Sequence, residues 1–126
     1  MKFKTSELTG QDLNEAVAIV VGPGWRRARL ADGLLVVGIG EEMDDPVVGG
    51  TPFEPSTDWA HGGPIIERES IMICRDSRRN TDWFANVDGY MSHDYVCSEY
   101  SATGPTPLIA AMRAFVLSRH GEAVDL

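Results

Sequence analysis

The stretch TPLIAAMRAFVLSRHG, residues 106–121, decides the fold class of this chain. Thr106 is a natural N-cap, Pro107 suits the first helical position, and Gly121 suits the position after the last turn, so the stretch predicts a helix over residues 107–120. Its apolar residues recur every three or four positions and predict a buried stripe of Leu108, Ile109, Ala111, Met112, Phe115 and Val116. This helix must therefore pack one face against the rest of the protein.

A second helix is predicted near the other end of the chain, over residues 10–21. Thr9 and Asp12 have the chemistry of a helix start, Leu8 can pack against Leu13 across it, and a Gly-Pro pair at 22–23 stops the helix. Between the two helices the sequence predicts mainly strands, over residues 25–30, 34–39, 70–75, 83–87 and 95–101.

These elements predict an α+β fold in which a small antiparallel β-sheet packs against an N-terminal and a C-terminal helix. Strictly alternating strand–helix–strand units, which would indicate a parallel sheet, are absent from the pattern. The 126 residues suit a single globular domain with one core, so we expect one domain over residues 1–126.

The chain is acidic, with a net charge of −8. This charge repels nucleic acid and anionic membranes, so direct nucleic-acid binding is not expected. An acidic row that mimics nucleic acid is a separate hypothesis and would need Glu41, Glu42, Asp44 and Asp45. The longest apolar run is too short to span a bilayer and no secretory signal precedes it, so we expect a cytoplasmic protein.

Several chemistries are excluded by the residues present. Lys2 and Lys4 are the only lysines, which excludes a P-loop lysine and a Schiff-base lysine elsewhere in the chain. The histidines at 61, 93 and 120 are widely spaced, so no metal site and no cofactor are expected. The cysteines, Cys74 and Cys97, lie in strand-like surroundings and are expected to be buried free thiols.

The segment most suggestive of a site lies within and just after a long stretch without periodicity. Residues 41–63 are predicted to be a loop, after which Pro64 opens a short helical turn over 65–69. The segment can hold a ligand or a partner: two glycines allow close approach, a tryptophan offers a flat face and charged groups offer polar contacts. The candidate residues are Asp58, Trp59, His61, Gly62, Gly63, Glu67 and Arg68. The alternative is a capped turn whose tryptophan fills the core.

Three segments give the chain a resemblance to a known family. Residues 4–10, 56–69 and 104–113, the last continuing through 121–124, resemble the small phage and prophage proteins of the NinX type. His61 stands where that family has a glutamine. The resemblance implies a phage or prophage origin and a role inside an infected bacterium, but no catalytic residue, because the family has no established biochemical function.

Two hypotheses for the function follow. The absent catalytic motifs, the acidic surface and the long loop favour a non-enzymatic accessory protein that binds a host or phage protein. The alternative is a small-molecule-binding protein or minor enzyme with a site around residues 56–69. A homodimer, formed through an edge strand or an exposed helix face, is compatible with either hypothesis.

Overall fold

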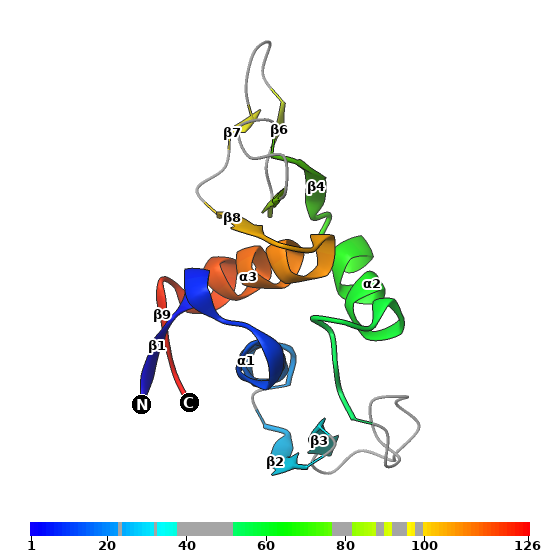
Figure 1. Cartoon of the computed structure of the whole chain (residues 1–126), viewed down its shortest axis with the longest axis vertical. Helices are drawn as coiled ribbons and strands as arrows, with labels where there is room; N and C mark the ends of the chain where they lie inside the picture. Colours follow the sequence, from blue (N-terminus) through cyan, green and yellow to red (C-terminus); the bar gives the residue numbers. More distant parts are fainter. Residues whose placement is uncertain are drawn as a thin grey trace.

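Helix α3 (Pro107–His120) lies at the centre of the protein, and the other elements pack around it (Figure 1). The computed structural model describes residues 1–22, 24–31, 33–37, 52–76, 82–87, 90–91, 96–97 and 100–126. The bounds of α3 are those predicted. The backbone N–H of Ile109 donates to Thr106 Oγ1 (3.1 Å), and Gly121 follows the last turn with a φ of 85°. Local capping signals therefore set both ends of the helix.

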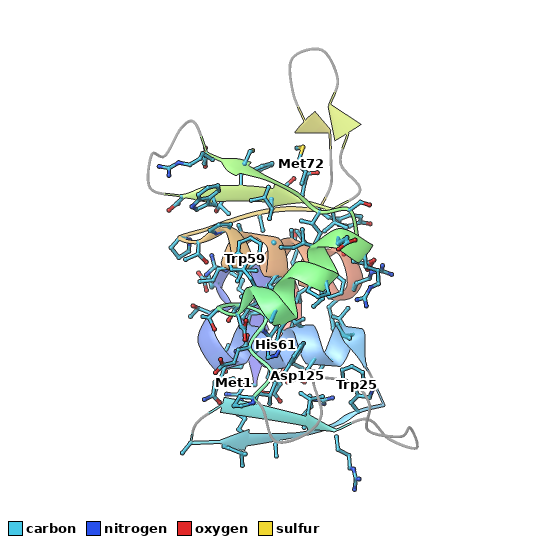
Figure 2. The ribbon with its side chains drawn as sticks, turned by 90° about the vertical axis from the view of Figure 1, so that its right-hand side faces the viewer. Met1, Trp25, Trp59, His61, Met72 and Asp125 are labelled. Atoms are coloured by element: carbon cyan, nitrogen blue, oxygen red, sulfur yellow. The ribbon has the colours of Figure 1, made fainter. Side chains whose placement is uncertain are left out.

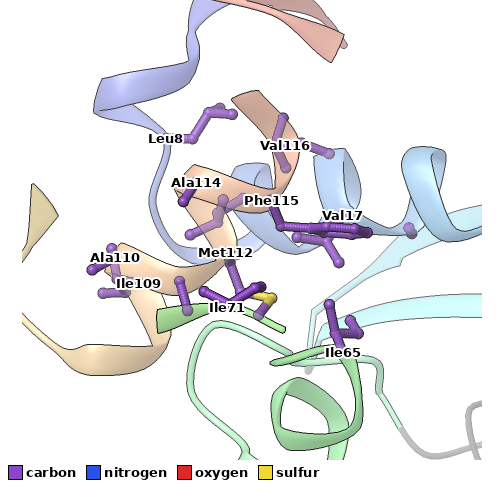
Figure 3. Packing of buried hydrophobic residues seen from close by; sticks show 14 of the residues in the cluster. Leu8, Val17, Ile65, Ile71, Ile109, Ala110, Met112, Ala114, Phe115 and Val116 are labelled. Carbon is purple, nitrogen blue, oxygen red and sulfur yellow. The ribbon is translucent and has the colours of Figure 1, made fainter. Parts of the chain in front are cut away.

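The predicted apolar stripe of α3 is buried, together with Ala110 and Ala114 on its other sides. Figure 3 shows Ile109, Ala110, Met112, Ala114, Phe115 and Val116 of α3, with Val17 contributed by α1 (Gly10–Val21) and Ile65 by α2 (Trp59–Arg68). The burial is wider than a single stripe because a sheet covers one side of α3 and α1 covers another (Figure 1).

Helix α1 also has the bounds that the sequence predicts. Leu8 and Leu13 are both buried at its start, as expected for a hydrophobic contact across the cap. Thr9 occupies the N-cap position, but its side chain makes no cap hydrogen bond. Asp12 instead binds Arg29 of the neighbouring hairpin (2.8 Å), so a tertiary contact uses the carboxylate that the local pattern assigned to the cap.

The first hairpin is confirmed and packs against α1. Strands β2 (Arg26–Leu30) and β3 (Gly33–Val37) pair antiparallel, with Leu30 opposite Gly33 at the turn. Residues 38 and 39 of the predicted strand lie outside the described residues. Arg29 ties β2 to α1 through Asp12 and Glu15, and hydrogen bonding to Asp12 raises the pKa of Arg29 above its ordinary value.

A three-stranded antiparallel sheet covers the opposite side of α3. It consists of β4 (Met72–Arg75), β5 (Trp83–Asn86) and β8 (Ser101–Gly104), in the order β4-β5-β8. Ala85 stands opposite Ile73 on one side and Ala102 on the other, which places a row of small and apolar residues on one face of the sheet. A Cβ added at Gly104 would lie 2.9 Å from the backbone nitrogen of Ala110, so β8 and α3 pack very closely there.

The predicted continuous strand over residues 95–101 is wrong. Its described parts are β7 (Val96–Cys97), which pairs with β6 (Tyr90–Met91), a bend at Tyr100, and the first residue of β8. The sequence favoured one continuous strand, but the strand that pairs with β5 begins only at Ser101 and runs to Gly104. The Asp-Gly turn predicted at residues 88–89 lies outside the described residues.

The burial predicted for Cys74 is also wrong: the thiol is free but exposed, because Cys74 alternates with the core-facing Ile73 on β4. The side chain of Cys97 lies outside what the structure describes.

The two ends of the chain form a strand pair that the sequence did not predict. Strands β1 (Lys2–Lys4) and β9 (Ala123–Asp125) pair antiparallel, with Phe3 opposite the buried Val124. Each strand is three residues long, which is too short for a periodic pattern to identify. The pair lies beside the C-terminal end of α3 (Figure 1).

The architecture confirms an α+β fold with helices near both ends of the chain. Across the described part of the chain, the strands form one three-stranded and three two-stranded antiparallel sheets, where a single sheet was expected. Among the described residues, no helix has both the length and the apolar character that crossing a bilayer requires.

Candidate functional site

The residues before α2 are held in place by backbone and side-chain hydrogen bonds. The N–H of the buried Phe53 donates to the carbonyl of Leu34 (2.7 Å), and the N–H of Ser56 donates to Oδ1 of the buried Asn14 (3.0 Å). The N–H of Asp58 donates to the carbonyl of Glu54 (2.8 Å) and closes a turn. This part of the predicted loop is therefore an anchored lead into a helix.

Helix α2 begins at Trp59, five residues before Pro64, at which the sequence predicted a helical turn to open. Residues 59–63 were predicted to be loop, but they are helical, and Pro64 lies inside the helix. Asp58 caps the start, because its Oδ1 accepts a hydrogen bond from the N–H of Ala60 (2.9 Å). Two glycines and a proline are poor helix formers, so tertiary packing has overridden local propensity here.

His61 is a structural residue in this arrangement. Its side chain is only 9 % exposed, its ring centroid lies 5.6 Å from that of Phe53, and its Nδ1 accepts a hydrogen bond from the N–H of Glu54 (3.0 Å). Nδ1 can accept only without a proton, which places the proton of the neutral ring on Nε2. Nδ1 is therefore occupied by a backbone hydrogen bond.

The two adjacent glycines of α2 have different surroundings. A Cβ added at Gly62 would lie 2.6 Å from Leu108 Cδ2 and 2.6 Å from the carbonyl oxygen of Pro55, whereas one at Gly63 meets nothing within 4 Å outside its own helix and its chain neighbours. The close approach that the glycines were predicted to allow is thus, at Gly62, an approach of the protein to itself. It brings α2 against the start of α3.

Trp59 is the first residue of α2 (Figure 2) and is exposed. Trp59 is 55 % exposed, whereas Trp25 and Trp83 are partly buried against the core. The alternative in which Trp59 fills the core is therefore wrong, and Phe53 is the buried aromatic of this segment. The outer side of α2 presents Trp59 together with the exposed Pro64 and Glu67.

The seven candidate residues share one helix and its cap, but they have separate environments. His61 and Gly62 face the protein, and Asp58 caps the helix. The remaining four, Trp59, Gly63, Glu67 and Arg68, are exposed or partly exposed. The exposed set around Trp59 can form a contact surface for another molecule, and we call Trp59, Gly63, Pro64 and Glu67 the α2 surface.

A cavity of about 300 Å³ lies elsewhere, at the C-terminal half of α3. Four separate parts of the chain line it: the start of the chain, strand β8, helix α3 and the residue before β9. The lining residues are Lys4, Thr5, Ser6, Ser101, Ala102, Arg113, Leu117 and Glu122. No spacing in the sequence joins these four parts, so the sequence offered no signal for this cavity.

Arg113, on α3, is bonded to two other parts of the chain. Its Nε donates to the carbonyl of Leu8 (2.8 Å) and its Nη1 donates to the carbonyl of Thr103 (2.9 Å). Burial lowers the pKa of Arg113 below its ordinary value, although the carboxylates of Asp82 and Glu7 oppose this effect. The guanidinium is thus a partly desolvated group whose hydrogen-bond partners are carbonyl oxygens.

The structure describes no group of three or more His, Cys, Asp or Glu side chains that could hold a metal ion, within the residues it covers. The acidic residues at 41, 42, 44 and 45, on which the nucleic-acid-mimic hypothesis depends, lie outside that part of the chain.

Comparison with known proteins gives one informative match. The model of the family described as "Bacteriophage P22, NinX" matches residues 4–119. A search of curated proteins found no match. The matched range contains the α2 surface, the lead into α2 and most of the cavity lining. Because the match covers nearly the whole chain, the resemblance noted on three segments is confirmed, and this chain belongs to the phage NinX family.

Proposed function

We propose that this chain is a non-enzymatic phage accessory protein that binds a protein of the host or of the phage through the α2 surface. Membership of the phage NinX family fits an accessory role. The observation that carries the proposal is the exposure of Trp59, at 55 %. Tryptophan is enriched among the residues that contribute most to protein–protein binding, because its large ring is buried when a partner covers it.

The α2 surface is held rigidly, which favours binding. Asp58 caps the helix, His61 fixes it to the backbone at Glu54, and Gly62 lets it pack directly on α3 at Leu108. A surface that is already ordered loses little conformational entropy when a partner binds. Trp59 can therefore serve as an anchor without a prior rearrangement of the helix.

The neighbours of Trp59 leave its ring accessible to a partner. Gly63, four residues further along α2 and therefore on nearly the same side of the helix, has no side chain. A pocket on a partner can approach the ring from this side without meeting a long side chain. Trp59 thus fits an apolar pocket on the second protein.

The charge of the chain indicates what surrounds that pocket. Glu67 belongs to the α2 surface, the Asp58 carboxylate caps the helix, Arg68 is the cation of its last turn, and the whole chain has a net charge of −8. Opposite charges speed up association and help to select the partner. We therefore expect basic residues around the apolar pocket of the partner.

The test uses a photo-cross-linking amino acid at position 59 in infected host cells, with the same residue at position 30 as the matched control. Leu30 is also exposed, at 46 %, but lies on the β2–β3 hairpin. We expect one covalent product from position 59 and none of the same mass from position 30. A product with the mass of two copies of the chain would identify a homodimer as the complex instead.

The partner identified by mass spectrometry is then purified and titrated with the variants. We expect Trp59→Ala to weaken binding by about 2 kcal/mol, roughly 30-fold, and Leu30→Ala to leave it unchanged. Equal affinities for Trp59→Ala and the unsubstituted chain would contradict the proposal. Tight binding of a metabolite that quenches Trp59 fluorescence, with no cross-linked protein, would favour the alternative of a small-molecule site around residues 56–69.

A further inference from the structure

The cavity at the C-terminal half of α3 has an unusual charge for this protein. Two cations, Lys4 and Arg113, and one carboxylate, Glu122, line it, so its wall has a net positive charge in a chain whose net charge is −8. Hydroxyl-bearing residues, Ser6 and Ser101, lie in the same wall. The composition is that of a small polar binding site with room for a compact ligand.

Neither cation forms an ion pair within the described part of the chain, although the charges of the Asp82 and Glu7 carboxylates act on Arg113. Arg113 binds two backbone carbonyls through Nε and Nη1, which leaves Nη2 as a further donor group on the same planar guanidinium. Lys4 likewise forms no ion pair with a described residue. The bonds to Leu8 and Thr103 fix the guanidinium in place, so it is oriented before any ligand arrives.

We propose that this cavity binds a small oxyanion, in the form of a carboxylate or phosphate group, between Arg113 and Lys4. The Nη2 group of Arg113 carries two N–H donors that can bind anion oxygens, and the hydroxyl of Ser6 can donate a further hydrogen bond. Glu122 disfavours a bare anion and favours a ligand that also carries a hydrogen-bond donor such as an ammonium group. The proposal is independent of the α2 surface, because α2 lies at the opposite end of α3 (Figure 1).

The experiment titrates the full chain with inorganic phosphate, acetate and glycine, each at low ionic strength of about 0.01 M, where charges are weakly screened. Backbone and arginine side-chain resonances are followed by ¹H–¹⁵N NMR. We expect saturable shifts at Ser6, Ser101 and Arg113 Nε for at least one probe. Phosphate and acetate distinguish the two forms of oxyanion, and comparison of glycine with acetate reports the contribution of Glu122.

Matched substitutions separate a site from a general charge effect. Lys4→Gln should weaken the probe about three- to tenfold, whereas Lys2→Gln, which removes the same charge two residues earlier on β1, should have little effect. Glu122→Gln should strengthen binding of phosphate and acetate. Arg113→Lys keeps the charge but loses the Nη2 donor and the bonds that orient it, and should abolish the shifts at Ser6 and Ser101 if the chain stays folded.

The proposal is overturned if no probe gives saturable shifts at the cavity, or if Lys2→Gln and Lys4→Gln weaken binding equally. Because both lysines are exposed and lie at the chain terminus, neither substitution is expected to unfold the protein, so the comparison holds even if Arg113→Lys does not fold.

Discussion

The adjacent glycines of α2 allow a direct test of how this helix is positioned. Gly62→Ala adds a methyl group 2.6 Å from Leu108 Cδ2 and 2.6 Å from the carbonyl oxygen of Pro55. The leucine can move, but the backbone carbonyl belongs to the anchored turn before α2. Gly63→Ala adds the same group where no atom outside the helix and its chain neighbours lies within 4 Å.

The magnitudes follow from two opposing effects. Alanine stabilises a helix interior by about 1 kcal/mol relative to glycine. Overpacking costs about 1–3 kcal/mol, and two contacts this short place Gly62→Ala near the upper end, for a net loss of about 1–2 kcal/mol. At position 63 the gain is opposed by the steric conflict between a Cβ and the following Pro64, so we expect a change within about 0.5 kcal/mol.

Thermal unfolding followed by far-ultraviolet circular dichroism measures the difference. For a chain of this size, 1 kcal/mol corresponds to roughly 4 °C in Tm, so Gly62→Ala should lower Tm by about 4–8 °C while Gly63→Ala leaves it nearly unchanged. Equal Tm values for the two variants would show that α2 can shift away from α3 without cost. The explanation of Gly62 by packing would then be wrong.

Three further predictions concern hydrogen bonds and are measured by urea unfolding. Thr106→Ala should lose about 1 kcal/mol because its hydroxyl caps α3, whereas Thr9→Ala should lose only a few tenths because its side chain makes no cap bond; equal losses would refute the distinction. His61→Leu should lose about 1–2 kcal/mol, and His61→Asn, whose Oδ1 takes the place of Nδ1, should retain most of the stability; a loss as large for Asn would assign the effect to ring packing. Asn14→Leu should lose about 1–3 kcal/mol by leaving the Ser56 N–H without its acceptor, and Asn14→Asp, which keeps that acceptor, should lose less.

The parts of the fold that the sequence predicts accurately are those whose signals lie within a few residues of one another. Helix α3 begins and ends where Thr106 and Gly121 place it, and the hairpin at residues 26–37 follows from its turn and its two flanking runs. Strands β1 and β9 could not be predicted, because each is stabilised by a partner more than a hundred residues away. Helix α2 was missed in its first half because glycine and proline weaken the helical signal locally.

The candidate site, too, could be predicted from the sequence only in part. The sequence pointed to residues 56–69, and the structure shows that Trp59 is exposed there, while His61 and Gly62 hold the helix in place. The exposure of Trp59 could not be predicted, because a tryptophan near two glycines can equally well be buried in the core. The family could be recognised from the sequence, because a family match depends on residue identity alone.

The sequence by itself determined the two long helices, the α+β class, the acidic charge and the phage NinX family, because each is encoded in local chemistry or in residue identity. Only the tertiary structure decided that Trp59 faces outward and that Lys4, Arg113 and Glu122 line one cavity. The physical reason is distance along the chain: α3 brings these residues together by burying its apolar sides, and the energy of that burial depends on all its neighbours at once.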